Sequence, residues 1–256
     1  MKLEPIGILA AVAEEINAIK ARVIHPEEIT IGKATFTKGT LNGVKVVVAL
    51  LENGWGKVDA SATVTTLILS CNVKAIIFSG LGGAIDPALT VGDIVISNIA
   101  FQHDFSGEPF FPQCHIPSAN TVEAKADQTL IACAEKAAQT FISQFDQIIE
   151  RRHIEQFKLH PKYVIGTIAT GDQFISCPEQ VTAIRAFDPT TQAVDMESAA
   201  ILHVAERFGI PAVVLRTMSD NANHDAHIDF PAFNQHIAGI YSAELVTNLL
   251  SVLKGA

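Results

Sequence analysis

The sequence predicts an α/β fold, in which one domain of 256 residues forms a central mixed, largely parallel β-sheet flanked by helices. Several short runs rich in valine and isoleucine are apolar throughout instead of alternating, which is typical of strands buried on both faces of a sheet. Stretches with helical periodicity lie between these runs, and such alternation indicates an α/β domain. Hydrophobic residues make up 48% of the chain, so it can supply a sizeable core.

The elements follow from these two patterns in chain order. The apolar runs predict strands at 6–11, 44–51, 75–78, 93–99, 163–169, 192–194 and 212–218. The helical patterns predict helices at 14–22, 58–70, 121–149 and 198–208, and a last helix at 234–253. The sequence shows no internal repeat and no linker, so we expect residues 1–256 to form a single domain.

Charge and composition exclude several classes of function. The formal net charge of −9 argues against a nucleic-acid partner, which needs a basic face. No apolar run reaches the roughly 18 residues of a membrane span. The first apolar stretch is broken by Glu14 and Glu15, so we expect no signal peptide and a cytoplasmic protein. The four cysteines are far apart and the nine histidines form no zinc motif, which gives no reason to invoke a metal or a cofactor.

Acidic, aromatic and glycine residues gather where the predicted strands end, and ligands of α/β folds bind at such ends. Glu15 follows the first strand, Phe174 follows the strand at 163–169, and Asp220 follows the strand at 212–218. Asp195 and Glu197 stand at the start of the otherwise apolar stretch AVDMESAAILHVA. The stretches GWG at 54–56 and SGLGG at 79–83 are expected to be turns that let the backbone approach a ligand.

Each of these residues also has a simpler structural explanation. The helix dipole favours a glutamate such as Glu15 in a first turn, and Asp195 or Asp220 could cap the segment that follows. A glycine stretch is often only a turn, and a lone phenylalanine is more often a core residue than a stacking ring. Neither glycine stretch matches the dinucleotide or P-loop pattern. The order of these residues along the chain favours the functional interpretation.

That order resembles one superfamily. IGILAAVAEEI, GWGKV, SGLGGAIDPALTVGDIVIS, TGDQFIS, AVDMESAAILHVA and LRTMSDNA together are similar to the nucleoside phosphorylase and nucleosidase superfamily, and within it to the 5′-methylthioadenosine/S-adenosylhomocysteine nucleosidases. The similarity covers about residues 6–100 and 163–250, and VDMES followed by MSDNA is its most specific part. It implies a nucleoside phosphorylase-like fold with a distorted, barrel-like sheet. It also implies an enzyme that hydrolyses 5′-substituted adenine nucleosides without a cofactor.

The resemblance assigns three residues to catalysis. Glu15 would hold and activate the attacking water, helped by Arg216, and Asp220 would protonate N7 of adenine. Cleavage of an N-glycosidic bond passes through a ribosyl cation, so one carboxyl group must donate a proton while another activates water on the opposite face. Asp220 then needs a raised pKa, which burial can supply.

The resemblance assigns other residues to substrate binding. Glu197 would bind the ribose 2′- and 3′-hydroxyls beside the backbone of Met196, so that substrate and water satisfy its oxygens, and Asp195 would be structural. Phe174 would stack on adenine, and the backbone of Ile175 would read its edge. Val12, Trp55 and Phe230 would form an apolar wall, and Leu81, Gly82 and Gly83 would face the nucleoside.

Three features depart from the family pattern. The family has Ser-Ala-Gly where this chain has Leu81-Gly82-Gly83, so a hydroxyl contact is missing or comes from Ser79. Ala13 replaces one of the two acidic residues that usually precede the catalytic glutamate. Residues 121–162 align poorly with the family, and this region looks longer than its counterpart there.

Two other functions remain open on the same fold. A phosphorylase needs a cationic, arginine-rich pocket, and the stretch after VGDIVIS, where the family's phosphorylases offer an arginine, reads NIAFQHDF and has none. A non-catalytic nucleoside-binding protein would need Phe174 and Glu197 but neither Glu15 nor Asp220. The sequence thus favours a hydrolase. It leaves the substrate open among 5′-methylthioadenosine, S-adenosylhomocysteine, 5′-deoxyadenosine and a futalosine-type nucleoside.

Residues 101–120 (FQHDFSGEPFFPQCHIPSAN) form an aperiodic segment with three prolines and four phenylalanines. Apolar loops of this kind cover something or dock on a partner. In the resembling family a loop here reaches into the neighbour's active site, which implies a homodimer with Phe105, Phe110 and Phe111 over the 5′-substituent. The alternative is a loop folded onto its own domain.

Overall fold

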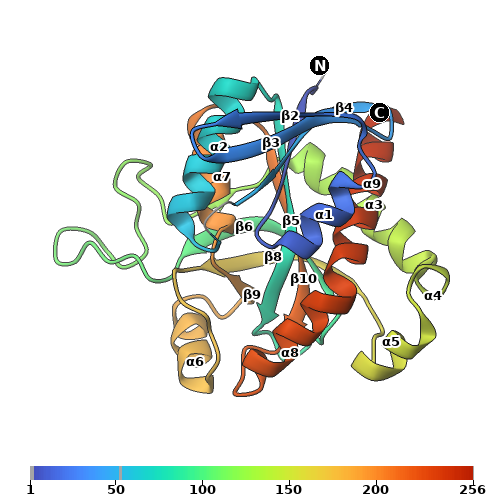
Figure 1. Ribbon diagram of the computed structural model, residues 1–256. Helices are drawn as coiled ribbons and strands as arrows, with labels where there is room; N and C mark the ends of the chain where they lie inside the picture. Colours follow the sequence, from blue (N-terminus) through green and yellow to red (C-terminus); the bar gives the residue numbers. More distant parts are fainter. Residues whose placement is uncertain (1–2, 52–53, 256) are drawn as a thin grey trace.

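A closed barrel of five strands forms the centre of the protein (Figure 1). The computed structural model describes residues 3–51 and 54–255. Strand β5 (Ala75–Ala84) pairs with β10 (Ala212–Asp220) along one edge and with β9 (Thr191–Asp195) near its carboxyl end. Strands β6 (Ile94–Gln102) and β8 (Tyr163–Thr170) complete the ring between β10 and β9. The expected barrel-like α/β sheet is thus confirmed.

Four strands extend the sheet from the first half of β5. Strand β1 (Ile6–Ala10) lies parallel between β5 and β4 (Val44–Leu50), and β3 (Ala34–Leu41) and β2 (Ile24–Ile31) follow in antiparallel order. A short strand, β7 (Ala124–Lys125), pairs with β6. Five of these ten pairings are parallel, and all five join strands that the apolar runs predict. The sequence patterns did not predict β2, β3 and β7.

Helices cover both sides of the sheet (Figure 1). Helices α1 (Ala13–Lys20) and α3 (Gln128–Ser143) pack against α9 (Gly239–Gly255) on one side, and α2 (Lys57–Cys71) packs against α7 (Ser198–Arg207) on the other. Most of the buried apolar residues of these helices and of the strands form one large core cluster. Strands β1 and β10 run parallel to β5, whereas β9 runs antiparallel to it, and the register places Val194 of β9 beside Gly83 near the carboxyl end of β5.

The helix predicted for 121–149 is wrong in its extent. Residues 124 and 125 belong to β7, and α3 begins only after Asp127, whose carboxylate accepts a hydrogen bond from Leu130 N at 2.9 Å. The short helices α4 (Phe145–Ile148) and α5 (Arg151–Phe157) follow α3. Helices α6 (Pro178–Phe187) and α8 (Ala226–Phe233), and the π-helix η1 (Asn234–Ala238), were not predicted as such.

The C-terminal helical stretch, residues 226–255, is long and apolar enough to cross a membrane by length and composition. Half of its most apolar window is buried inside the protein. Tyr241, Leu245 and Leu249 of this stretch lie in the core, where α9 contacts α1 and α3. Core packing therefore accounts for the apolarity of this helix.

The stretch SGLGG is not the turn that its glycines suggested. Residues 79–83 continue β5 in extended conformation and pair with β10. A Cβ atom on Gly80 would lie 2.4 Å from Arg216 Nη1, and one on Gly83 would lie 3.0 Å from Asp220 Oδ1. These glycines thus let the charged side chains pass close to the backbone of β5.

Candidate active site

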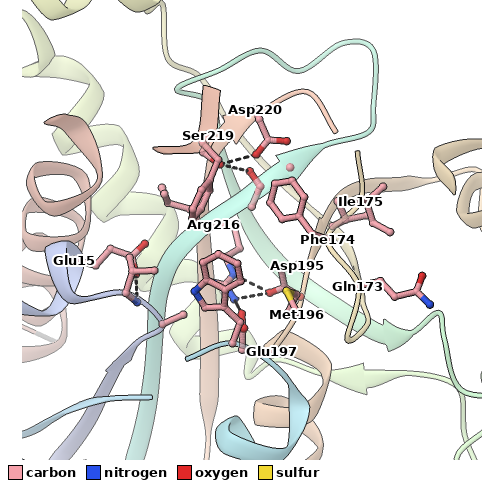
Figure 2. Close-up of a pocket in the computed structure, with 18 residues that line it drawn as sticks. Glu15, Gln173, Phe174, Ile175, Asp195, Met196, Glu197, Arg216, Ser219 and Asp220 are labelled. Atoms are coloured by element: carbon pink, nitrogen blue, oxygen red, sulfur yellow. Dashed lines mark hydrogen bonds and ion pairs between the residues drawn. The ribbon is translucent and has the colours of Figure 1, made fainter. Parts of the chain in front are cut away.

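A pocket opens at the carboxyl ends of the strands, and Figure 2 shows the side chains that line it. All thirteen residues assigned above to catalysis or substrate binding lie in its lining: Val12, Glu15, Trp55, Leu81, Gly82, Gly83, Phe174, Ile175, Met196, Glu197, Arg216, Asp220 and Phe230. Five further lining residues had no assigned role there: Ala11, Gln173, Val194, Asp195 and Ser219.

Arg216 is the buried cation around which the pocket is organised. It lies within β10 with 1% of its surface exposed, and its guanidinium carbon lies 4.0 Å from the ring centroid of Phe78. Its Nη2 atom lies 2.7 Å from Asp195 Oδ2 and 2.7 Å from Glu197 Oε2. A buried cation requires such partners, because an unpaired charge in the interior costs several kcal/mol.

Asp195 is the structural partner of Arg216. Its Oδ2 accepts a hydrogen bond from Arg216 Nε at 2.8 Å, and its Oδ1 accepts one from Thr170 Oγ1 at 2.6 Å. The backbone N–H and hydroxyl of Ser198, at the start of α7, also donate to this carboxylate. Asp195 thus joins β8, β10 and α7, which explains the first of the two carboxylates in AVDMES.

Glu197 binds protein groups through both of its oxygens. Oε1 accepts a hydrogen bond from Gly56 N at 2.9 Å, and Oε2 accepts one from Arg216 Nη2. The expectation that substrate and water alone satisfy these oxygens is therefore wrong. Burial raises the pKa of Glu197, although the Arg216 charge acts in the opposite direction. Each carboxylate oxygen still has a second lone pair for a ligand hydroxyl.

Glu15 lies in the first turn of α1 and is fully buried. Its Oε2 accepts a hydrogen bond from Val12 N at 3.3 Å, whereas its Oε1 has no protein partner. Burial raises the pKa of Glu15 to about 8, against the opposing effect of Arg216. The ion pairs of Arg216 go to Asp195 and Glu197, so its expected help to Glu15 reduces to the influence of its charge.

Asp220 ends β10 on another wall of the pocket from Glu15 (Figure 2). Its Oδ1 accepts a hydrogen bond from Ala222 N at 2.8 Å, and its Oδ2 accepts one from Ser219 Oγ at 2.8 Å. Burial raises the pKa of Asp220 to about 6, even though both hydrogen bonds lower it. Asp220 therefore both shapes the following turn and presents a carboxyl group that can carry a proton near neutral pH.

The hydroxyl group at the pocket belongs to Ser219, not to Ser79. Ser79 is buried within β5 and does not line the pocket, so the suggestion that it replaces the family's serine contact is not supported. Ser219 precedes Asp220 in the MSD motif, but nothing in the motif alone shows where its hydroxyl points.

Three aromatic rings form the open side of the pocket. Phe230, from α8, lies edge-on to Trp55 with the ring centroids 5.5 Å apart, and to Phe174 with the centroids 6.0 Å apart. Trp55 is 47% exposed and Phe174 is 38% exposed. Their exposed faces are available to stack on a flat ligand.

The structure does not bring into this pocket the three phenylalanines of the 101–120 segment that were expected over the 5′-substituent. Phe105, Phe110 and Phe111 are absent from the lining, and Phe110 is 85% exposed. Figure 1 shows the segment as green loops that project away from the sheet. Their expected contact with a partner subunit stays a prediction.

Comparison with known proteins supplies the family. The model of the phosphorylase superfamily matches residues 5–251. The chain belongs to the phosphorylase superfamily. A superfamily member from Geobacillus kaustophilus, named 5′-methylthioadenosine/S-adenosylhomocysteine nucleosidase, is 35% identical over 249 residues, which are 97% of each chain. The resemblance that the motifs indicated is thus confirmed over nearly the whole chain.

Solved structures of the superfamily agree. A nucleosidase of the same name from Colwellia psychrerythraea, in complex with adenine, has a TM-score of 0.85 and 32% identity, covering 97% of this chain and 95% of that chain. The futalosine hydrolase of Helicobacter pylori has a TM-score of 0.81 and 31% identity, covering 96% of this chain and 97% of that chain. Both names describe cleavage of a nucleoside.

Proposed function

We propose that this protein hydrolyses the N-glycosidic bond of 5′-substituted adenine nucleosides and releases adenine. The observation that carries the proposal is the pair of buried carboxyl groups with raised pKa values, Glu15 and Asp220, on different walls of one pocket (Figure 2). Hydrolysis of a glycosidic bond needs one carboxyl group to donate a proton and another to accept one. Relatives named as nucleosidases, including one solved with adenine, support this assignment.

Glu15 and Asp220 divide the chemistry. Water attacks C1′ of the ribose while the bond from C1′ to N9 of the base breaks. Glu15 accepts the proton that the water loses, and Asp220 donates a proton to N7, so that adenine leaves as a neutral molecule. Attack on the face opposite the base inverts the configuration at C1′. The acidic residues of the pocket also stabilise the positive charge that develops on the ribose.

The other lining residues orient the nucleoside. Glu197, fixed by Gly56 N and Arg216, accepts hydrogen bonds from the ribose 2′- and 3′-hydroxyls. Phe174 stacks on the adenine, and the backbone of Ile175 binds its edge. The remaining apolar lining, which surrounds the ribose and the 5′-substituent, comprises Val12, Trp55, Leu81, Met196 and Phe230.

The charges of the site favour water over phosphate as the nucleophile. Arg216 is the one cation among the lining residues that the structure describes, and two carboxylates already neutralise it. Lys57, which follows Trp55 and Gly56 in the sequence, lies 2.6 Å from Asp104 and 3.8 Å from Asp172. A phosphorylase needs cations that are available to a phosphate ion.

A product assay tests this proposal. The protein is incubated with 5′-methylthioadenosine in phosphate-free buffer and again with added phosphate, and adenine is measured. Adenine without phosphate supports hydrolysis, whereas a phosphate requirement with a ribose 1-phosphate product would indicate a phosphorylase. Tight binding without turnover in either buffer would indicate a nucleoside-binding protein. The same assay, read as release of the free base, ranks S-adenosylhomocysteine, 5′-deoxyadenosine and a futalosine-type nucleoside as substrates.

A further inference from the structure

A charged cluster next to the pocket joins two segments that line it, around Trp55 and Phe174, to the end of β6. Lys57 begins α2 directly after Trp55 and Gly56, Asp104 follows β6, and Asp172 follows β8 two residues before Phe174. Lys57, Asp104 and Asp172 do not themselves line the pocket. The roles proposed above leave all three without a function.

Asp172 caps helix α2 from a distant part of the sequence. The N-cap position of α2 is Gly56, which has no side chain to accept a hydrogen bond, and Asp172 Oδ1 accepts one from Lys57 N at 2.8 Å. A carboxylate at this position satisfies a free N–H group and faces the positive end of the helix dipole. A Cβ atom on Gly56 would lie 2.9 Å from Asp172 Oδ1, so glycine leaves room for the carboxylate.

The Lys57 ammonium group closes a ring of interactions. Lys57 Nζ lies 2.6 Å from Asp104 Oδ1 and 3.8 Å from Asp172 Oδ2, and Asp104 Oδ2 accepts a hydrogen bond from Asp172 N at 2.9 Å. Burial raises the pKa of Asp104, but the hydrogen bonds from Lys57 and Asp172 N outweigh it and lower that pKa overall. The side chains of Lys57 and Asp104 are 17% and 15% exposed, so water screens this pair less than a surface pair.

Both sides of the pocket connect to this ring. Gly56 N, next to Lys57, binds Glu197 Oε1, and Gly171 N, next to Asp172, donates to the Asp195 carbonyl at 3.0 Å. Phe174 and Trp55 are each more than a third exposed, so core packing alone does not fix their positions. The ring of interactions holds the backbone segments that carry these two exposed side chains.

We propose that Lys57, Asp104 and Asp172 form a positioning clamp that holds the Gly56–Glu197 contact at a fixed distance from Phe174 and thereby sets the affinity for the nucleoside. The three residues act through their neighbours and do not touch the substrate. Loss of the clamp leaves Glu15 and Asp220 in place, so it weakens binding more than it slows the chemical step. The choice of substrate rests on the function proposed above.

A double-mutant cycle tests the clamp. Lys57→Met and Asp104→Asn should each lower kcat/KM for 5′-methylthioadenosine about tenfold, mainly by raising KM. The double variant should lose little more than either single variant, because both substitutions remove the same contact. Lys57→Arg, which keeps the charge, should stay within about threefold of the wild type.

Arg151→Met, which removes an exposed ion pair with Glu155 on α5, is the matched control. Losses that simply multiply, or an unchanged KM, would overturn the clamp.

A second measurement is independent of activity. Trp55 is the single tryptophan of the chain and lies two residues before Lys57, so its fluorescence reports on this segment. Lys57→Met and Asp104→Asn should raise the acrylamide quenching constant of Trp55 about twofold with the fold intact, and Arg151→Met should leave it unchanged. Unchanged quenching would refute the clamp even in an active enzyme. A wild type that cleaves no nucleoside would refute the proposed function and leave this test valid.

Discussion

Glu15 couples the stability of this protein to pH. Its pKa rises from the ordinary 4.5 to about 8, chiefly because the carboxyl group is fully buried and in addition because of the Glu197 charge. The folded state thus holds a proton that the unfolded chain has already lost between these two values. The protonated group contributes its full stability below pH 4.5, and this contribution is lost as the pH rises through 8.

Glu15→Gln removes this titration and keeps the shape of the side chain. We expect the variant to gain stability relative to the wild type as the pH rises from 5 to 8.5, by on the order of 4 kcal/mol at the upper end. Urea unfolding of both proteins across this range measures the difference, in which the other titrating groups cancel. A difference that does not change with pH would show that Glu15 titrates normally. The variant should also lose activity, because it cannot accept a proton from water.

The pH dependence of kcat/KM should be bell-shaped, with limbs near pH 6 and pH 8. Below about 6 both Asp220 and Glu15 are protonated and the base is lost, whereas above about 8 both are ionised and the acid is lost. Between these values the two groups together carry one proton, mostly on Glu15, and the catalytic form with ionised Glu15 and protonated Asp220 is a small fraction that stays constant with pH. Initial rates at low concentrations of 5′-methylthioadenosine, measured from pH 5 to 9, test this shape.

Ser219→Ala should shift only the acidic limb of the pH profile of kcat/KM. The hydroxyl of Ser219 donates to Asp220 and lowers its pKa, so its removal should raise that pKa and shift the acidic limb upward. The basic limb should stay in place, because burial of Glu15 dominates its pKa. A shift of the basic limb alone would exchange the assignments of the two groups.

Asp220→Asn tests the acid directly. The asparagine side chain can still accept the hydrogen bond from Ala222 N but cannot donate a proton of a carboxyl group to N7. We expect adenine release to fall by about 10²- to 10⁴-fold, with an unchanged circular dichroism spectrum. Near-complete activity would show that another group protonates the base.

At the scale of single elements, the glycines of strand β5 are important because they carry no side chain. Gly80 lies beneath Arg216 Nη1 and both carboxylate oxygens of Glu15, which would lie 2.4, 3.1 and 3.2 Å from an added Cβ atom. Arg216 cannot move aside, because Asp195, Glu197 and the Phe78 ring hold it. A glycine-rich strand thus allows a buried cation and a buried acid to lie directly on the sheet.

Gly80→Ala should therefore destabilise the protein by about 2 kcal/mol and lower kcat/KM together. Urea unfolding and the adenine assay measure the two effects. Gly255→Ala, at the end of α9, is the control, since among the described residues beyond its own helical neighbours no atom would lie within 4 Å of its added Cβ. Normal stability of Gly80→Ala would show that Arg216 moves more freely than its contacts suggest.

The strands that the sequence predicted are those whose residues are apolar throughout. All seven apolar runs became strands, because a strand buried on both faces has few polar residues. Strand β2, with the sequence IHPEEITI, escaped prediction because it is largely exposed and contains Pro26. The stretch SGLGG was mistaken for a turn, since glycine signals either a bend or a close approach and the sequence does not distinguish the two.

The pocket residues could be predicted from the resemblance, but their protein partners could not. The Glu197 carboxylate meets the N–H of Gly56, 141 positions away in the sequence, and no spacing rule indicates such a contact. Asp195 was expected to be structural, but its partner Arg216 was expected to help Glu15 instead of pairing with Asp195. Partners across a barrel follow from strand order and register, which a single sequence with no alignment does not reveal.

At the scale of the whole molecule, we propose a homodimer in which the 101–120 segment of one protomer covers the pocket of the other. The segment projects from the barrel, and Phe110 is 85% exposed on it (Figure 1). An exposed phenylalanine pair beside a loop that leaves the fold is typical of a contact surface. The aromatic, open side of the pocket would lie beneath such a cover.

Phe110→Ala combined with Phe111→Ala should raise KM for 5′-methylthioadenosine about tenfold and should change KM for adenosine less, because adenosine lacks the apolar 5′-substituent. Steady-state kinetics on both substrates measure this ratio, and sedimentation equilibrium measures the oligomeric state. Phe208→Ala, another half-exposed phenylalanine at the end of α7, is the control. Equal changes for both substrates would argue against a cover over the 5′-group.

The pairing of β5 with β10 closes the barrel, and the same two strands hold Gly80, Arg216 and Asp220. Breaking this seam would open the barrel and separate the charged groups at once, because no other pair of strands replaces it in the ring. A partly unfolded form that lacks this seam therefore cannot keep the pocket. The backbone amides of this seam should exchange with solvent deuterium only when the entire chain unfolds, so heat should abolish activity and structure in one cooperative step.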